Sequence, residues 1–168
     1  MIGIRPLKEE DAAYFAEEEC RQGWHSTPDK LLGRMRDRRG GRCIPLVAEL
    51  DGVPAGYVNV YPDGGQRNPF EGRGIPEIVD FAVLEKFRRR GVGSALMDEA
   101  ERIAGEYSDT VFLGVGLHAG YGSAQRMYAK RGYVPDGSGV WYCGRVCEPY
   151  SSCENGDDLI LYLSKKLR

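Results

Sequence analysis

The stretch that decides the fold runs from residue 77 to residue 94 and reads Glu77-Ile-Val-Asp-Phe-Ala-Val83-Leu-Glu-Lys-Phe-Arg88-Arg-Arg-Gly91-Val-Gly93-Ser94. Its first eight residues are mostly apolar and β-favouring, which predicts a strand buried on both faces. A basic turn follows, and two glycines then open a predicted helix over residues 91–106. The N–H groups of a helix N-terminus are unpaired and suit a phosphate. Because the glycines lack Cβ atoms, the backbone can approach such an anion closely. The stretch therefore predicts a pyrophosphate cradle.

Two common phosphate motifs do not match this stretch. A dinucleotide fingerprint needs a third glycine where Leu96 stands, and a Walker A loop needs Gly-Lys-Ser/Thr. The stretch instead resembles the Arg/Gln-x-x-Gly-x-Gly/Ala motif of the GNAT family of N-acetyltransferases, with Arg88, Gly91 and Gly93 on the motif positions. In that family the loop binds the pyrophosphate of acetyl-CoA.

A second segment strengthens the resemblance. Residues 124–133 match the family signature Ala-x-x-x-Tyr-x-x-x-Gly-Phe/Tyr, with Tyr128 and Gly132 in place. The chain departs from the family at Tyr121, where an Asn often stands, so the contacts of that Asn must be made in another way.

The remaining elements follow from periodicity and turn signals. Strands are expected at 2–5, 43–50, 53–61, 77–84, 110–115, 133–135, 140–143 and 159–163, and helices at 8–22, 28–38, 91–106 and 123–131. On the first helix, Ala12, Phe15, Ala16 and Cys20 share one face. Asp51-Gly52 predicts a tight hairpin turn. The order β-α-α-β-β-β-α-β-α-β-β predicts an α/β fold, and the resemblance implies a mixed, mostly antiparallel sheet flanked by helices.

Composition predicts one domain over residues 1–168. A chain of 168 residues buries roughly 70% of its unfolded surface, enough for a real core. The 23 basic and 25 acidic residues are too evenly balanced for a nucleic-acid footprint. No apolar run reaches the roughly 20 residues of a membrane span, and no secretion signal is recognised, which favours a cytoplasmic protein with no membrane partner.

The five cysteines favour free thiols over a metal site. Cys143, Cys147 and Cys153 are separated by three and five residues, which misses the usual C-x2-C spacing, and both histidines lie far away in sequence. No metal cofactor is therefore expected.

The resemblance implies acetyl-CoA as co-substrate, transferred directly to an amine without an acetyl-enzyme. The implied cofactor-binding residues are Ala82, Val83, Arg88, Arg90, Gly91, Val92, Gly93 and Ser94. The resemblance also implies that Tyr128 protonates the leaving thiolate, although its spacing from Ala124 equally fits a core aromatic.

Glu77 is the candidate general base, because some family members carry the catalytic glutamate at this strand position. The alternative is a solvated carboxylate at a strand end. Asp80 is the other candidate base. Strand alternation puts it on the face opposite to Glu77, so the two carboxylates are not expected to act as a pair. The alternative for Asp80 is a carboxylate that is simply ion-paired.

The acceptor side is less defined. Trp24, His25 and Phe70 are the candidate substrate-binding residues, from the turn between the first two helices and from the long loop 62–76. Tyr61, Asn68, Glu71 and Arg73 lie in or beside that loop and are expected to border the same cleft. The acidic run of residues 17–19 either attracts a cationic amine or forms a solvated face.

The sequence thus predicts a cytoplasmic, acetyl-CoA-dependent N-acetyltransferase acting on a primary amine of a small molecule. Alternatives are transfer to a protein amine, a catalytically silent acyl-CoA-binding sensor, and a nucleotide-binding protein. A homodimer is expected from the resemblance, with residues 143–155 as a candidate partner surface.

Overall fold

The computed structural model describes residues Met1 to Arg168, and they form two compact units. The first unit combines residues 1–62 with 78–103, and the second combines residues 63–77 with 104–168. The expectation of a single domain stays a prediction.

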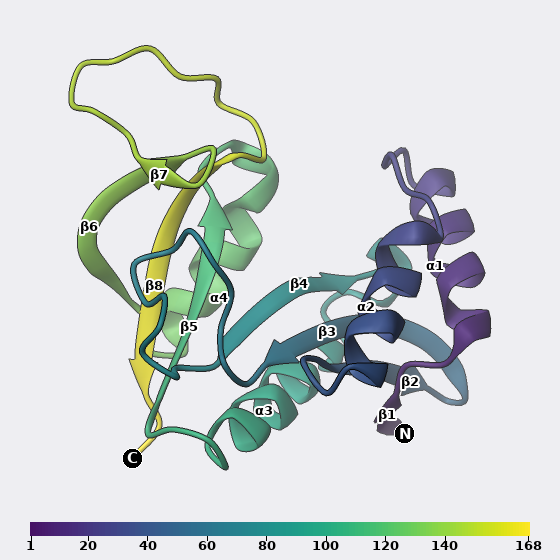
Figure 1. The fold of residues 1–168 in the computed structure, drawn as a ribbon. Coiled ribbons are helices and arrows are strands. Elements are labelled where there is room, and N and C mark those ends of the chain that lie inside the picture. The colour runs from purple at the N-terminus through teal and green to yellow at the C-terminus, as the bar shows by residue number, and fades with distance from the viewer. The chain divides into compact units, whose positions relative to one another are not determined.

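The first unit holds the N-terminal strands and three of the four α-helices. Its strands are adjacent in the order β1-β2-β3-β4, and β1, β2 and β3 pair antiparallel (Figure 1). Its elements are β1 (Ile2–Pro6), α1 (Glu9–Arg21), α2 (Asp29–Arg39), β2 (Ile44–Leu50), β3 (Val53–Tyr61), β4 (Glu77–Val83, in this unit from Ile78), η1 (Glu85–Phe87) and α3 (Val92–Ala104, in this unit to Ile103). Asp51 and Gly52 both have positive φ, so the predicted tight turn between β2 and β3 is confirmed.

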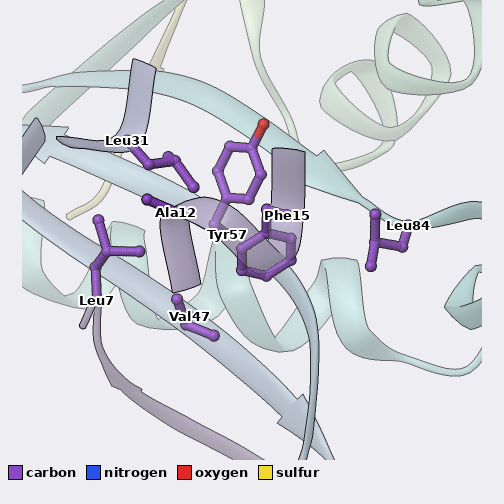
Figure 2. Close-up of a cluster of buried hydrophobic side chains, with 7 residues drawn as sticks. All are labelled: Leu7, Ala12, Phe15, Leu31, Val47, Tyr57 and Leu84. Carbon is purple, nitrogen blue, oxygen red and sulfur yellow. The ribbon is translucent and has the colours of Figure 1, made fainter. Parts of the chain in front are cut away.

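The core of the first unit is built where the two N-terminal helices meet β2 and β3. Figure 2 shows seven of its buried side chains: Leu7, Ala12, Phe15, Leu31, Val47, Tyr57 and Leu84. Phe15 of α1 meets Tyr57 of β3 edge to face at 5.0 Å between centroids. The predicted apolar face of α1 is confirmed for Ala12, Phe15 and Ala16, which are all buried.

The assignment of Cys20 to that face was wrong. Cys20 is exposed, and Glu19 is buried in its place with 1% exposure. Glu19 tolerates burial because the Tyr57 hydroxyl donates to its Oε1 at 2.5 Å and Lys30 Nζ lies 3.4 Å from Oε2. A buried carboxylate with such partners escapes the desolvation penalty of an isolated charge.

Gly56 sets the spacing between β3, β4 and α3. A Cβ at this position would lie 2.6 Å from the Ala82 carbonyl oxygen, 3.1 Å from Leu96 Cδ1 and 3.2 Å from Val83 Cα. The absent side chain therefore lets β4 and α3 pack closely on β3.

The second unit holds the C-terminal strands, adjacent in the order β5-β8-β6-β7 and paired antiparallel. Its elements are β5 (Thr110–Gly116), η2 (Ala119–Tyr121), α4 (Gly122–Lys130), β6 (Val134–Tyr142), β7 (Arg145–Val146) and β8 (Leu159–Lys166). Segment 63–76 crosses in front of β5 in Figure 1, where the Phe70 ring stacks on Phe112 at 4.6 Å.

The predicted fold class, α/β with a mostly antiparallel sheet flanked by helices, is confirmed, but two details differ. The strands expected at 133–135 and 140–143 are one strand, β6, whose register shifts between Pro135 and Val140. The residues between bulge out, with positive φ at Gly137 and Gly139. The two-residue strand β7 was not expected.

The second difference concerns β4, which was expected to be buried on both faces. Only Ile78 is fully buried, and the other residues are half-buried. Asp80, in the middle of the strand, is charged and has φ of +52°. A polar residue in this conformation interrupts the regular pleat, so its neighbours are not enclosed from both sides.

None of the helices has the length and apolar composition needed to cross a membrane.

Candidate active site

The junction between β4 and α3 has the geometry of an anion site. The 3-10 turn η1 follows β4, and positive φ values at Arg89 (+57°) and Gly91 (+86°) turn the chain into α3. The bond from Ala95 N to Gly91 O, 3.0 Å long, is the first of this helix. The N–H groups of Val92, Gly93 and Ser94 come before it and have no acceptor within the helix, so they can serve a ligand.

The two glycines of the junction serve different purposes. Gly91 adopts a left-handed conformation, which a residue with a Cβ enters only with strain. At Gly93 a Cβ would lie 3.1 Å from Phe81 Cζ and 3.6 Å from Val83 Cγ2, so the missing side chain keeps the start of α3 close to β4. Ala82 and Val83, at the end of β4, are half-buried and border this space.

The arginines give the junction its charge. Arg88 and Arg90 are exposed. Arg88 Nε donates to the Val83 carbonyl at 3.3 Å, and its guanidinium lies 5.7 Å from the centroid of Trp24. The only carboxylate near Arg88 is Glu85, at 3.7 Å, and both side chains face solvent. Free N–H groups, absent Cβ atoms and accessible guanidiniums together fit a diphosphate.

Asp80 is ion-paired, as one of its two alternatives predicted. Arg34 of α2 donates from Nε to Asp80 Oδ2 at 3.0 Å and from Nη1 to the Tyr61 hydroxyl at 2.6 Å. That hydroxyl donates in turn to Asp37 at 2.6 Å. Burial alone would lower the pKa of Arg34, but the charge and hydrogen bonds of Asp80 and the Tyr61 hydroxyl hold it above its usual value. This network ties α2 to the residue of β4 that has positive φ.

Glu77 lies in the second unit, at the first position of β4, and is half-buried. Its carboxylate faces segment 63–76, where a Cβ on Gly65 would lie 2.6 Å from Glu77 Oε2. Tyr162 of β8 lies near this charge: burial, and then the carboxylate of Glu77, raise the pKa of Tyr162 to about 12. Glu77 is thus a half-buried carboxylate beside Gly65 and within the electrostatic influence of Tyr162.

Tyr128 lies on α4 and is 5% exposed. Burial raises the pKa of its phenol well above the ordinary value of 10.0. The expected helix stop at Gly132 is confirmed by its φ of +89°. Gln125 Nε2 donates to the Gly116 carbonyl at 2.8 Å, which fixes α4 against the end of β5.

Tyr121, where the family often has Asn, makes contacts of its own. Its hydroxyl donates to Asp157 Oδ1 at 2.7 Å, and its ring lies against Gly116, where a Cβ would be 2.3 Å away. His118 Nε2 lies 3.3 Å from the same carboxylate oxygen. These contacts tie the end of β5 to the segment before β8.

The three predicted acceptor residues occupy different surroundings. Trp24 is 37% exposed and lies beside Arg88, and His25 is exposed in the same turn of the first unit. Phe70 belongs to the second unit, where it lines a cavity of about 380 Å³ with Pro69, Arg73, Asp136, Ser138, Trp141 and Ser164. Asp136 and Ser138 of β6 were not predicted as site residues, because the sequence Pro-Asp-Gly-Ser-Gly at 135–139 is typical of a solvent-exposed turn.

The acidic run of α1 is only partly solvated, since the Glu17 side chain is 63% exposed. Glu17 and Glu18 pair with Arg21, Glu18 also pairs with Lys86, and Glu19 is buried.

All five cysteines have free thiols, and burial raises the pKa of the Cys43 thiol to about 11. No group of three His, Cys, Asp or Glu side chains is arranged to hold a metal ion.

Comparisons with known proteins show the family and agree with the fold. A family model described as the acetyltransferase (GNAT) family matches residues 7–133. No curated protein sequence matches the chain. Among solved structures, Ard1 from Thermoplasma volcanium is 22% identical with a TM-score of 0.70, covering 99% of this chain and 98% of its own.

Two further solved structures have similar folds. YncA from Salmonella typhimurium, described with its cofactor acetyl-CoA, is 18% identical with a TM-score of 0.69. The ribosomal-protein-S18-alanine N-acetyltransferase from Escherichia coli is 15% identical with a TM-score of 0.68. Each comparison covers 99% of this chain and 94% of the other.

Proposed function

Because this chain belongs to the acetyltransferase (GNAT) family, an enzyme family that uses acetyl-CoA, we propose that it transfers an acetyl group directly from acetyl-CoA to a primary amine of a small molecule. The observation that carries the proposal is the β4–α3 junction. There the N–H groups of Val92, Gly93 and Ser94 precede the first helical hydrogen bond, beside two accessible guanidiniums.

In this proposal the junction holds the diphosphate of the co-substrate. Backbone N–H groups and the positive end of α3 would bind the anion, and Arg88 and Arg90 would add charge. Ala82 and Val83 would border the pantetheine arm, which supplies the thioester. The family's residues at these positions support this assignment.

Two residues of the second unit are proposed to move protons. Glu77 would accept the proton of the attacking amine, directly or through water, because a neutral amine is required for attack. Tyr128 would give its proton to the sulfur as the thiolate leaves, and its buried phenol stays protonated until then. The position of Tyr128 in the second family signature supports its role.

A small acceptor is favoured by the cavity beside Phe70, since about 380 Å³ accommodates a molecule of metabolite size. A cytoplasmic location, a homodimer and the absence of a nucleic-acid or membrane partner stay predictions.

A protein amine is the second candidate acceptor. One of the similar folds, the ribosomal-protein-S18-alanine N-acetyltransferase, is named for a protein acceptor. The discriminating experiment compares free amines with peptides of varied N-terminus at equal concentration. Faster acetylation of peptides than of every free amine would favour the protein acceptor.

Calorimetric titration of acetyl-CoA, with CoA, ATP and NAD as controls, tests the cradle first. We expect binding by acetyl-CoA and CoA alone, followed by thiol release when amines are added. Binding without thiol release on any amine would indicate a silent acyl-CoA sensor. Absence of binding by both CoA compounds would refute the proposed use of acetyl-CoA.

A further inference from the structure

The cavity of the second unit carries charges that the protein leaves without charged partners. Arg73 is exposed at the wall of this cavity, and its guanidinium lies 5.8 Å from the centroid of the Phe70 ring. Asp136 accepts only from Ser138, from its N–H at 3.2 Å and its hydroxyl at 3.0 Å. Neither residue forms an ion pair, whereas the buried Asp11 and Glu19 of α1 pair with Arg5 and Lys30.

The walls of the cavity are fixed before any ligand arrives. Asn68 is 5% exposed; its Nδ2 donates to the Gly65 carbonyl at 2.7 Å and its Oδ1 accepts from Phe70 N at 2.8 Å. On the other side, Trp141 Nε1 donates to Ser138 Oγ at 2.8 Å, and that hydroxyl donates to Asp136. The backbone of Phe70 and the ring of Trp141 are therefore held by hydrogen bonds, and the Phe70 ring is held by stacking on Phe112, so little conformational entropy is lost when a ligand binds.

A row of aromatic rings connects the cavity to Glu77. Phe70 stacks on Phe112, whose ring centroid is 6.3 Å from that of Tyr162, and Trp141 meets Tyr162 edge to face at 5.5 Å. Tyr162 in turn lies within the electrostatic influence of Glu77. The same segment 63–76 supplies both Arg73 and the glycine against which the Glu77 carboxylate lies. The cavity and the proposed base thus belong to the same unit and both adjoin segment 63–76, although Glu77 does not itself line the cavity.

We infer that this cavity is the acceptor subsite and that it selects an amine that also carries a carboxylate, namely a small amino acid-type molecule with an apolar or aromatic side chain. The inference rests on the proposed function. Arg73 would bind the acceptor's carboxylate, Phe70 and Trp141 would contact its side chain, and the amine would face Glu77. Asp136 would repel a second carboxylate, so dicarboxylic amino acids would be poor acceptors.

The chemistry of each part supports this class. A guanidinium binds carboxylates through paired, charge-assisted hydrogen bonds, which an amine without a carboxylate cannot form. Two aromatic walls offer apolar contact and would also hold an aromatic side chain in stacked or edge-on geometry. A plain alkylamine would leave Arg73 unused.

The test compares pairs of amines that differ only in the carboxylate. L-phenylalanine and phenethylamine form one pair, and L-leucine and isoamylamine form another, each assayed by thiol release from acetyl-CoA. For the natural protein we expect the carboxylated member to have the higher kcat/KM by about ten- to a hundredfold, the factor of a hydrogen bond to a charged group. Arg73→Gln should raise KM for L-phenylalanine by a similar factor and erase the preference.

Arg145→Gln is the matched control. Arg145 is an exposed arginine of β7 in the same unit and does not line the cavity, so its replacement should leave the preference intact. L-glutamate serves as the dicarboxylic probe and should be acetylated more slowly than L-leucine.

Equilibrium titration of L-phenylalanine into both variants separates this inference from the proposed function. Binding that requires Arg73, without thiol release on any amine, would support the subsite and refute the transferase. Thiol release with equal kcat/KM for both members of each pair, or a preference that survives Arg73→Gln, would overturn the subsite and leave the transferase standing. Neither binding nor thiol release would overturn both.

Discussion

The interior of the first unit and the cavity of the second treat charge in opposite ways. In the first, Glu19 is held by Tyr57 and Lys30, Asp80 by Arg34, and Asp11 by Arg5. In the second, Arg73 and Asp136 line a cavity without ion pairs. Paired charges in a protein interior satisfy the fold itself, whereas unpaired charges around a cavity are available to a ligand. Substitutions in the first set should therefore change stability, and substitutions near the cavity should change activity.

Two buried tyrosines, one in each unit, extend this contrast between stability and activity from charged groups to hydroxyl groups. Tyr128→Phe removes the proposed acid, so we expect turnover to fall by about a hundredfold, near the lower limit for general acid catalysis. The KM for acetyl-CoA and the free energy of unfolding should change little. Thiol-release kinetics and denaturant unfolding measure these quantities. Tyr133→Phe, on the ring 5.8 Å away, is the control; unchanged turnover in Tyr128→Phe would remove it as the acid.

Tyr57→Phe should show the reverse pattern. The substitution leaves the Glu19 carboxylate buried with only Lys30 nearby, so the free energy of unfolding should fall by about 2–3 kcal/mol, the range for an unsatisfied buried charged group. Urea denaturation measures the loss. Glu17→Gln, at an exposed ion pair of the same helix, should change stability by less than about 0.5 kcal/mol. Equal effects of the two substitutions would mean that the buried pairing contributes nothing to the fold.

Gly91→Val separates backbone strain from ligand binding. A valine at a φ of +86° is strained, so the free energy of unfolding should fall by about 1–2 kcal/mol and acetyl-CoA should bind about tenfold more weakly. Gly41→Val is the matched control, because Gly41 has a φ of +72° in an exposed turn with open space around it. The control should lose stability to the same extent and keep its affinity in calorimetric titration. Normal affinity in Gly91→Val would place the phosphates elsewhere.

Asp11 provides the smallest effect, through pH. Burial would raise the pKa of this carboxyl, but hydrogen bonds from the Arg5 side chain and the Lys8 N–H outweigh it and hold the pKa below 3.8. A depressed pKa contributes stability that is present above 3.8 and is lost as the pH falls further. The natural protein should thus lose more unfolding free energy than Asp11→Asn when the pH is lowered from about 5 to about 3. Parallel curves for the two proteins would contradict this; Glu10→Gln, exposed at the start of the same helix, is the control.

The parts of the fold that could be predicted from the sequence are those fixed by local chemistry. The hairpin at Asp51-Gly52, the bounds of β3 and the glycine-opened helix α3 follow from turn residues and periodicity, and the structure bears them out. The contents of the cradle, by contrast, stay predictions until a ligand is bound.

Other features depend on partners that are distant in the sequence. Helical spacing puts Glu19 on the same face as Phe15, but its charge argued against burial, and its partners Tyr57 and Lys30 lie on other elements. The cavity was missed for a similar reason: Asp136 and Ser138 belong to a bulge of β6, and Phe70 meets Phe112 only through long-range packing. Local signals carry no information on which distant residues meet.

Gly56 has a consequence for how this chain tolerates change. It lies in the middle of a regular strand, and its φ is not positive. No ligand is expected to contact it. Neither its conformation nor its chemistry would therefore indicate that position 56 needs a glycine. Yet even a methyl group there would meet the backbone of Ala82 and Val83, and the strand that holds these residues leads into the junction with α3. In a saturation mutagenesis screen, substitutions at this position would be selected by the spacing that they allow between β3 and its neighbours β4 and α3. Glycine, which has no side chain, should be the only residue that is tolerated.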